Sequence, residues 1–207
     1  MRLSKRANPE DRRRDLIEAA VRVLAERGAA GASVRTIAAA ANVSPGLVTH
    51  HFGGVDRLVA ASYDHVAAQV AAALEAAVAA AGSSPPARLG AFVAANFTAP
   101  IADPALLATW LALWSLARGD PAMLARHEHH YAGFRVRLEV LLAECGVAPA
   151  RVRLAAIGVT ALVDGLWLEL CLSPDSFSAD EARRIATAYL AGLRGGDSPL
   201  PSGERVG

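Results

Sequence analysis

The chain has 207 residues, of which 53% are hydrophobic, and its charged side chains almost balance to a net charge of +1. Its two cysteines, Cys145 and Cys171, are too few and too far apart for a disulfide framework, which is typical of the reducing cytoplasm. The basic N-terminal segment has no apolar core, so we do not expect a signal peptide. The longest uncharged runs, such as Pro104–Ala117, are shorter than the roughly 18–20 residues of a membrane span, so we expect no membrane partner.

Positive charge is concentrated at the N-terminal end. Residues 1–55 contain nine Lys and Arg against five Asp and Glu, which gives +4 there and leaves −3 for the remainder. A basic end on a nearly neutral chain is typical of a surface that binds nucleic acid, although a solvated charged terminus has the same composition. The first residues predict an arm, from which Lys5 and Arg6 can reach phosphates or a minor groove.

Residues 33–52 predict two short helices joined by a tight turn. Ser33 precedes an apolar periodic run and is a typical N-cap, and Ser44 followed by Pro45 starts the second helix in the same way. Asn42 lies at the turn, because Asn tolerates a left-handed backbone better than most residues. A pair of glycines after residue 52 ends the second helix.

Two helices of about two turns each cannot bury enough surface alone. A helix at residues 11–27 completes the unit, with one apolar face: Leu16, Ala20, Val23 and Leu24. The three predict a helix-turn-helix, in which the second short helix enters the DNA major groove and the first lies across the backbone. The exposed positions of the second short helix are small or hydrogen-bonding: Ser44, Pro45, Gly46, Thr49, His50 and His51. An ordinary helical hairpin in a core is the alternative, but caps and turn agree on the first interpretation.

Three motifs of this region resemble the TetR family of bacterial repressors: SVRTIA at 33–38, ANVS at 41–44 and HHF at 50–52. The resemblance implies a double-stranded DNA operator as partner. It adds three residues of the first short helix to the expected DNA contacts: Ser33, Arg35 and Thr36. The family usually has a phosphate-contacting Lys at the position of Val55, and Arg57 is the expected replacement.

The remainder of the chain predicts only helices. Glycine and proline breaks separate six of them, at residues 55–81, 87–100, 104–118, 121–145, 149–172 and 179–194. No strand alternation is present. We therefore predict an all-α fold of about nine helices: a DNA-binding domain at 1–54, a ligand-binding and dimerisation domain at 55–194, and a disordered tail at 195–207.

Aromatic and polar side chains form a further pattern in the predicted second domain: Asn96, Phe97, Trp110, Trp114, Asp164 and Trp167. The strings AANF, WLALW and LVDGLWLELCLS resemble the BetI-type branch of the family, which implies a response to choline or betaine aldehyde. Aromatic faces hold a quaternary ammonium group by about 0.5–2 kcal/mol each, and Asp164 can act as the counter-ion. The alternatives are that the tryptophans are core residues, or that the effector is another cation or an apolar metabolite.

The string RHEHHY at 126–131 raises the question of a metal site. His127 and His130 share a helix face, but a zinc or nickel site needs three or four converging ligands. We therefore predict a solvated or pocket-rim cluster, with no metal and no cofactor; the alternative role for one of these histidines is to line an effector pocket. No phosphate loop, nucleophile elbow or zinc-protease motif is present, so we assign no catalytic residue. An all-α enzyme that uses Asp164, Glu169 or the His127–His130 group is the distant alternative, and a DNA-architectural protein would not need the long apolar second domain.

Paired operator half-sites require a dimer, and the resemblance implies a four-helix bundle from the last two helices of both chains. The candidates at compatible spacing on these helices are Leu154, Ile157, Ala161, Ile185, Ala188, Tyr189 and Leu193. We expect a homodimer in which an effector favours one arrangement of the helix at 55–81. That shift would change the separation of the two DNA-binding heads.

Overall fold

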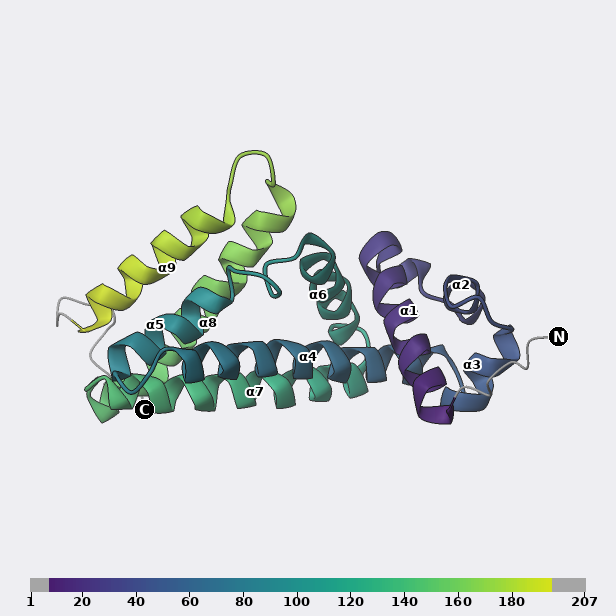
Figure 1. Ribbon diagram of the computed structural model, residues 1–207, viewed down its shortest axis with the longest axis horizontal. Coiled ribbons are helices and arrows are strands. Elements are labelled where there is room, and N and C mark those ends of the chain that lie inside the picture. Colours follow the sequence, from purple (N-terminus) through teal and green to yellow (C-terminus); the bar gives the residue numbers. More distant parts are fainter. Residues whose placement is uncertain (1–7, 195–207) are drawn as a thin grey trace. The chain divides into compact units, whose positions relative to one another are not determined.

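The computed structural model describes residues 8–194, and within them every regular element is an α-helix, as predicted (Figure 1). The helices of these residues are α1 Pro9–Gly31, α2 Val34–Ala40, α3 Pro45–Phe52, α4 Val55–Ala80, α5 Pro85–Ala95, α6 Pro104–Ala117, α7 Pro121–Glu144, α8 Pro149–Leu172 and α9 Ala179–Arg194. Lys5, Arg6 and the predicted tail at 195–207 lie outside the described residues.

The helix-turn-helix has a core of its own. The predicted apolar face of α1 is buried, with Leu16 1% exposed, and it packs with Ile37 of α2, Val48 of α3 and Leu58 of α4. The helix of α1 is interrupted at Gly28, whose backbone is left-handed at φ 64°, directly after the predicted end. Burial on this scale is what allows helices as short as α2 and α3 to persist.

The helices gather into two compact units. The first contains the described residues up to Ala68 together with Ala108–His127, and the second contains Gln69–Leu107 and the described residues from Glu128 onward. The helix-turn-helix therefore shares a unit with the C-terminal part of α6 and the first turns of α7. The predicted division at residues 54 and 55 marks the end of the helix-turn-helix and stays a prediction.

The largest error in a predicted bound is at α5, which ends at Ala95 and not at residue 100. The side-chain amide of Asn96 donates to the carbonyl of Phe92 at 2.9 Å, so it satisfies a backbone group that the next helical turn would otherwise bond. Pro100 has no N–H, and it disfavours helical backbone at the residue before it. Asn96 therefore accounts for the end of α5, and Pro100 prevents the helix from resuming before it.

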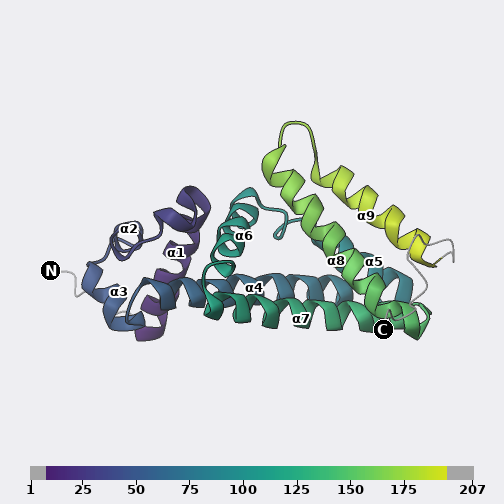
Figure 2. The same cartoon turned by 180° about the vertical axis from the view of Figure 1, so that it is seen from behind.

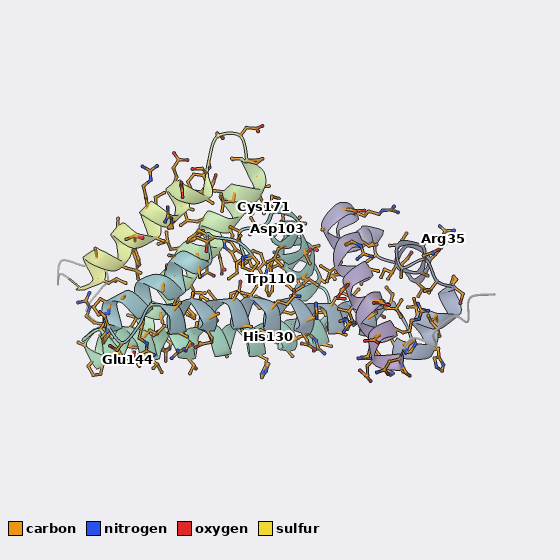
Figure 3. The ribbon with its side chains drawn as sticks, in the orientation of Figure 1. Arg35, Asp103, Trp110, His130, Glu144 and Cys171 are labelled. Carbon is orange, nitrogen blue, oxygen red and sulfur yellow. The ribbon has the colours of Figure 1, made fainter. Side chains whose placement is uncertain are left out.

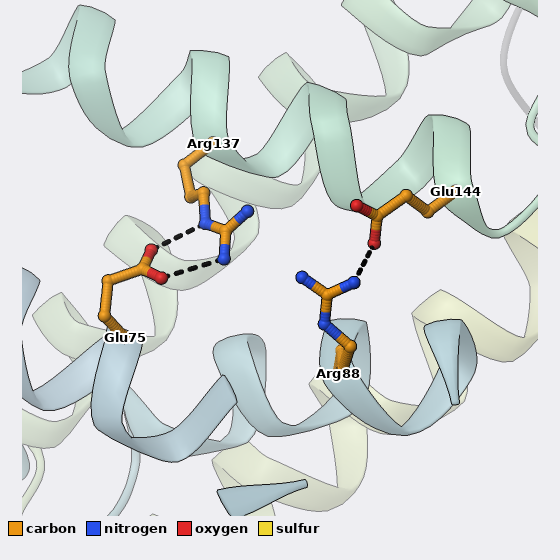
Figure 4. A network of polar contacts seen from close by, with 4 residues as sticks. All are labelled: Glu75, Arg88, Arg137 and Glu144. Atoms are coloured by element: carbon orange, nitrogen blue, oxygen red, sulfur yellow. Dashed lines mark hydrogen bonds and ion pairs between the residues drawn. The ribbon is translucent and has the colours of Figure 1, made fainter. Parts of the chain in front are cut away.

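Ion pairs tie α7 to α4 and α5 within the second unit (Figure 4). Arg137 donates to both carboxylate oxygens of Glu75, at 2.6 and 2.8 Å, and Arg88 donates to Glu144 at 2.6 Å. The hydrogen bonds that Arg137 donates to the Glu75 carboxylate raise the pKa of Arg137, so its charge is secure. Partly exposed pairs of this kind contribute about 0–1 kcal/mol each.

The helix α8 is long and apolar enough to cross a membrane, judged by length and composition alone, with a mean hydropathy of 1.7 over 18 residues. The sequence analysis did not anticipate that α8 is long and apolar enough for a span. It considered only runs without charged residues, and α8 contains charged residues. One face of α8 is nevertheless buried inside the protein, at Ala155, Ala156 and Val159 among others. Asp164 lies in the middle of the helix, where a lipid environment would disfavour a carboxylate. Length and composition alone are therefore weak evidence that α8 crosses a membrane.

Candidate nucleic-acid interface and effector region

The start of α2 is held by a reciprocal pair of side chains. The Thr36 backbone N–H donates to Ser33 Oγ at 3.1 Å, and the Ser33 N–H donates to Thr36 Oγ1 at 2.9 Å. This capping box confirms Ser33 as the predicted N-cap. Both hydroxyls stabilise the helix start, and the predicted DNA contacts of Ser33 and Thr36 stay predictions. The turn that follows places Asn42 at φ 54°, the left-handed conformation predicted for it.

The helix α3 presents a polar face to solvent. Pro45 is its first residue, as predicted, and Gly53 ends it with a left-handed φ of 75°. Ser44 is the N-cap residue, as predicted, although its side chain makes no capping hydrogen bond. The exposed residues are Ser44, Pro45, Gly46, Thr49 and His50, whereas His51 is half-buried. Val48 and Phe52 point into the core, so the face opposite them is the one available to DNA.

Basic side chains are exposed on the two helices that flank α3 in the sequence. Arg35 is exposed on α2 (Figure 3), and Arg57 is exposed in the first turn of α4. The structure adds Arg13 of α1, which the sequence analysis did not single out. Its Nη1 atom donates to the carbonyl oxygen of His51 at 3.3 Å, so it lies at the end of α3. In the sequence, Arg13 is one of three consecutive arginines at 12–14, and this run is the one signal of its role. The contact with His51 joins residues 38 positions apart, so sequence spacing does not reveal it.

Two of the predicted effector residues lie in the first unit. Trp110 is 5% exposed on α6 (Figure 3), and its ring lies 6.2 Å from that of Trp114. Trp110 also packs edge-on against Tyr63 of α4, with ring centroids 5.2 Å apart. The Tyr63 hydroxyl lies 3.0 Å from Nδ1 of His127, so one histidine of the predicted solvated cluster is hydrogen-bonded to a buried tyrosine. In the part of the chain that the structure describes, no three ligand side chains converge on a metal position.

The other four predicted effector residues lie in the second unit. Trp167 is buried and donates its indole N–H to the backbone oxygen of Asn96 at 3.0 Å. Phe97 is 2% exposed beside Asn96. Since the Asn96 amide bonds its own helix, the core interpretation accounts for these three residues without a ligand. Their role in binding stays a prediction.

Asp164 differs from the other three predicted effector residues of the second unit, because it is the one with an ionisable side chain, and that side chain is partly buried. The hydroxyl of Tyr131 on α7 donates to Asp164 Oδ1 at 3.0 Å. Burial raises the pKa of Asp164 to about 6, and the hydrogen bond from Tyr131 and the nearby charge of Arg135 only partly oppose this effect. A carboxylate that is ionised at neutral pH but poorly solvated is suited to bind a cation. Sequence analysis found Asp164 but not Tyr131, because the two lie 33 positions apart.

Figure 2 shows α8 and α9 side by side. The described chain leaves some apolar side chains of these two helices exposed. Ile157 is 36% exposed and Ile185 is 44% exposed, and both are predicted dimer residues. Ala161 and Ala188 are also exposed, and Leu154 and Tyr189 are half-buried. Leu193 is only 4% exposed, so it already packs within its own chain.

Two family models match this chain. The model of bacterial regulatory proteins of the tetR family matches residues 16–61, which include α2 and α3. The model described as BetI-type transcriptional repressor, C-terminal, matches residues 85–195. Together they cover the helix-turn-helix and most of the helices that follow it.

Individual relatives agree with these matches. A protein from Burkholderia thailandensis named HTH-type transcriptional regulator BetI is 40% identical over 183 residues, which are 87% of this chain and 92% of the relative. A solved structure assigned as a transcriptional regulator from Pseudomonas aeruginosa PAO1 has a TM-score of 0.83 at 40% identity, covering 92% of this chain and 94% of that one. A solved structure assigned as a regulator from Saccharomonospora viridis, in complex with choline, has a TM-score of 0.76 at 19% identity, covering 88% and 96%. These relatives are regulators rather than enzymes.

Proposed function

Because the chain belongs to the TetR family of bacterial transcriptional regulators, in its BetI-type branch, we propose that it is a homodimeric cytoplasmic repressor that a small organic cation releases from its operator. The first candidates for that cation are choline and betaine aldehyde. An apolar effector is the second candidate, since the core interpretation accounts for Asn96, Phe97 and Trp167.

The DNA-binding part of the proposal rests on the exposed face of α3. Thr49 and His50 lie on that face, and the buried residues Val48 and Phe52 fix its orientation. Hydroxyl and imidazole groups can hydrogen-bond to base edges and to phosphates. Two copies of α3 about one DNA turn apart would read paired half-sites, which requires a dimer.

The effector part rests on Asp164. A quaternary ammonium ion cannot donate hydrogen bonds, so it needs a carboxylate and aromatic faces rather than polar partners. Asp164 supplies a poorly solvated carboxylate that Tyr131 orients, and a cation beside it would compensate the cost of its ionisation. The choline named in the Saccharomonospora viridis structure supports this ligand class through a shared fold alone.

The dimer part rests on the uncovered apolar side chains of α8 and α9. Ile157 and Ile185 would be buried against a second copy, together with the small side chains of Ala161 and Ala188. Burial of apolar surface contributes about 25 cal/mol per Å². Exposed alanines beside these isoleucines allow helices of two chains to approach closely.

Intrinsic fluorescence tests the effector proposal, because Trp110, Trp114 and Trp167 are the only tryptophans in the sequence. Choline or betaine aldehyde should give a saturable change, whereas 3,3-dimethylbutan-1-ol, which has the shape of choline without its charge, should give none. Asp164→Asn should weaken the response, and Asp175→Asn, an exposed carboxylate of the same unit, should not. An equal response to the neutral alcohol would favour an apolar effector. No response at millimolar concentrations would contradict the cation.

Fluorescence anisotropy tests the DNA-binding proposal on a duplex selected by the purified protein from random sequences. Thr49→Ala combined with His50→Ala should weaken binding to the selected duplex, because both side chains lie on the exposed face of α3. Thr187→Ala, which is exposed on α9, is the control and should not change binding. Unchanged affinity of the double variant would remove α3 as the reading helix.

A further inference from the structure

An open pocket of about 390 Å³ lies where α3 ends and α4 begins. Its ionisable lining residues are all basic: Arg13, His50, His51 and Arg57. No carboxylate lines it, and Thr49 adds a hydroxyl. A concave surface with this lining attracts anions and supplies hydrogen-bond donors to them.

Arg13 is held at this pocket by two contacts. Its Nη1 atom donates to the His51 carbonyl, and its guanidinium carbon lies 4.3 Å from the centroid of the Phe52 ring. A guanidinium group has five N–H donors, so one backbone bond leaves others for a ligand. Neither contact neutralises its charge. The neighbouring Arg14 differs, because it pairs with Asp11 at 3.1 Å and faces Glu18 at 3.9 Å.

Arg57 reaches the same pocket from α4. Its Nη1 atom lies 3.2 Å from the position that a Cβ on Gly53 would occupy. Gly53 therefore has two roles, since it ends α3 with a left-handed backbone and leaves room for the guanidinium group. Among the residues that the structure describes, no ion pair joins Arg13 or Arg57 to a carboxylate.

We propose that this pocket binds one phosphodiester group of the DNA backbone, which Arg13 and Arg57 hold together, and that this contact sets the register of α3 on the duplex. The proposal rests on operator binding through α3. Guanidinium groups match the paired oxygens of a phosphate, and an open pocket leaves room for the strand to continue on both sides. A phosphate contact positions the protein and carries no sequence information. The two arginines should therefore support binding to every sequence equally.

The salt dependence of DNA binding tests this role. The logarithm of the binding constant falls linearly with the logarithm of salt concentration, with a slope near −0.9 per contacted phosphate. Arg13→Gln and Arg57→Gln should each make the slope less steep by up to about 0.9, and should weaken selected and scrambled duplexes by the same factor. Arg14→Gln is the matched control and should leave the slope unchanged. Unchanged slopes for both pocket variants, with circular dichroism showing intact folds, would overturn the proposal.

Neutral methylphosphonate linkages locate the contact. Placed one at a time along the selected duplex, one linkage per half-site should weaken the full-length wild type but not Arg13→Gln or Arg57→Gln. The proposal is wrong if no linkage distinguishes the wild type from the two pocket variants. If, in addition, inorganic phosphate at constant ionic strength protects only the wild type from thermal unfolding, the pocket is a free-anion site. If Thr49→Ala with His50→Ala loses binding while both slopes stay unchanged, only the pocket proposal fails. A wild type that binds no duplex at low salt would overturn both proposals.

Discussion

Replacing Asp164 by Asn should stabilise the protein at neutral pH. The pKa of this carboxyl group rises from 3.8 to about 6 on folding, chiefly because it is buried. One pKa unit corresponds to about 1.36 kcal/mol, so the ionised carboxylate costs the folded chain about 3 kcal/mol. Asn has the same shape and its oxygen can still accept the hydrogen bond from Tyr131, but it does not ionise.

The effect has a defined dependence on pH. Below about pH 3 the carboxyl group is protonated in the folded and unfolded chains, so it costs nothing. Between about pH 4 and pH 6 the unfolded chain loses the proton first, and the free energy of unfolding of the wild type falls as pH rises. Above about pH 7 the loss is complete. The variant should therefore exceed the wild type by about 3 kcal/mol at pH 8 and by roughly half as much at pH 5.

Urea unfolding followed by circular dichroism, at one protein concentration and several pH values, measures this difference. A stability gap that stays constant from pH 5 to pH 8 would refute the reasoning, as would a variant less stable than the wild type at pH 8. Tyr131→Phe gives an independent check. It removes the hydrogen bond that favours the charged form, so the pKa of Asp164 should rise further and the stability loss should extend to higher pH.

Three further outcomes are expected. Ser33→Ala should lower the free energy of unfolding by about 1 kcal/mol because it removes the capping box, whereas Ser44→Ala, at a cap with no side-chain bond, should change it little; equal losses in urea unfolding would contradict this. Ile157→Arg should dissociate the dimer in sedimentation velocity and weaken operator binding, and an unchanged mass would place the interface elsewhere. Trp114→Ala should weaken the effector response in the anisotropy assay and leave operator binding intact, whereas loss of folding would assign Trp114 to the core.

Local signals explain why the helix-turn-helix could be predicted from sequence. Asn42 tolerates the left-handed turn, Pro45 suits a first helical position, and Ser33 finds its capping partner three residues away. Each signal acts within one helical turn, so no tertiary contact is needed to interpret it. The wrong bound of α5 is instructive, because the amide of Asn96 competes for carbonyls that the alanine pattern assigns to the helix.

The functional side chains depend on contacts that sequence spacing does not reveal. Arg13 reaches the end of α3 across 38 positions, and Tyr131 reaches Asp164 across 33. Sequence analysis found Asp164 through a resemblance, but its burial and raised pKa follow from the fold. Ser44 shows a further limit, since the residue type predicts the N-cap position correctly but does not reveal that the side chain makes no capping bond.

The composition of the first compact unit suggests how an effector signal would reach DNA. The helix-turn-helix shares this unit with the C-terminal part of α6 and the start of α7. Trp110 of α6 packs against Tyr63 of α4, and Thr109 Oγ1 donates to the Val21 carbonyl of α1 at 3.4 Å. Since a packed core changes arrangement as a whole, an effector that shifts α6 must also move α1 and α4. For DNA release, the effector would have to favour an α6 position in which the helix-turn-helix no longer fits its operator. The size of this shift is limited by the difference between the effector's affinities for the two arrangements.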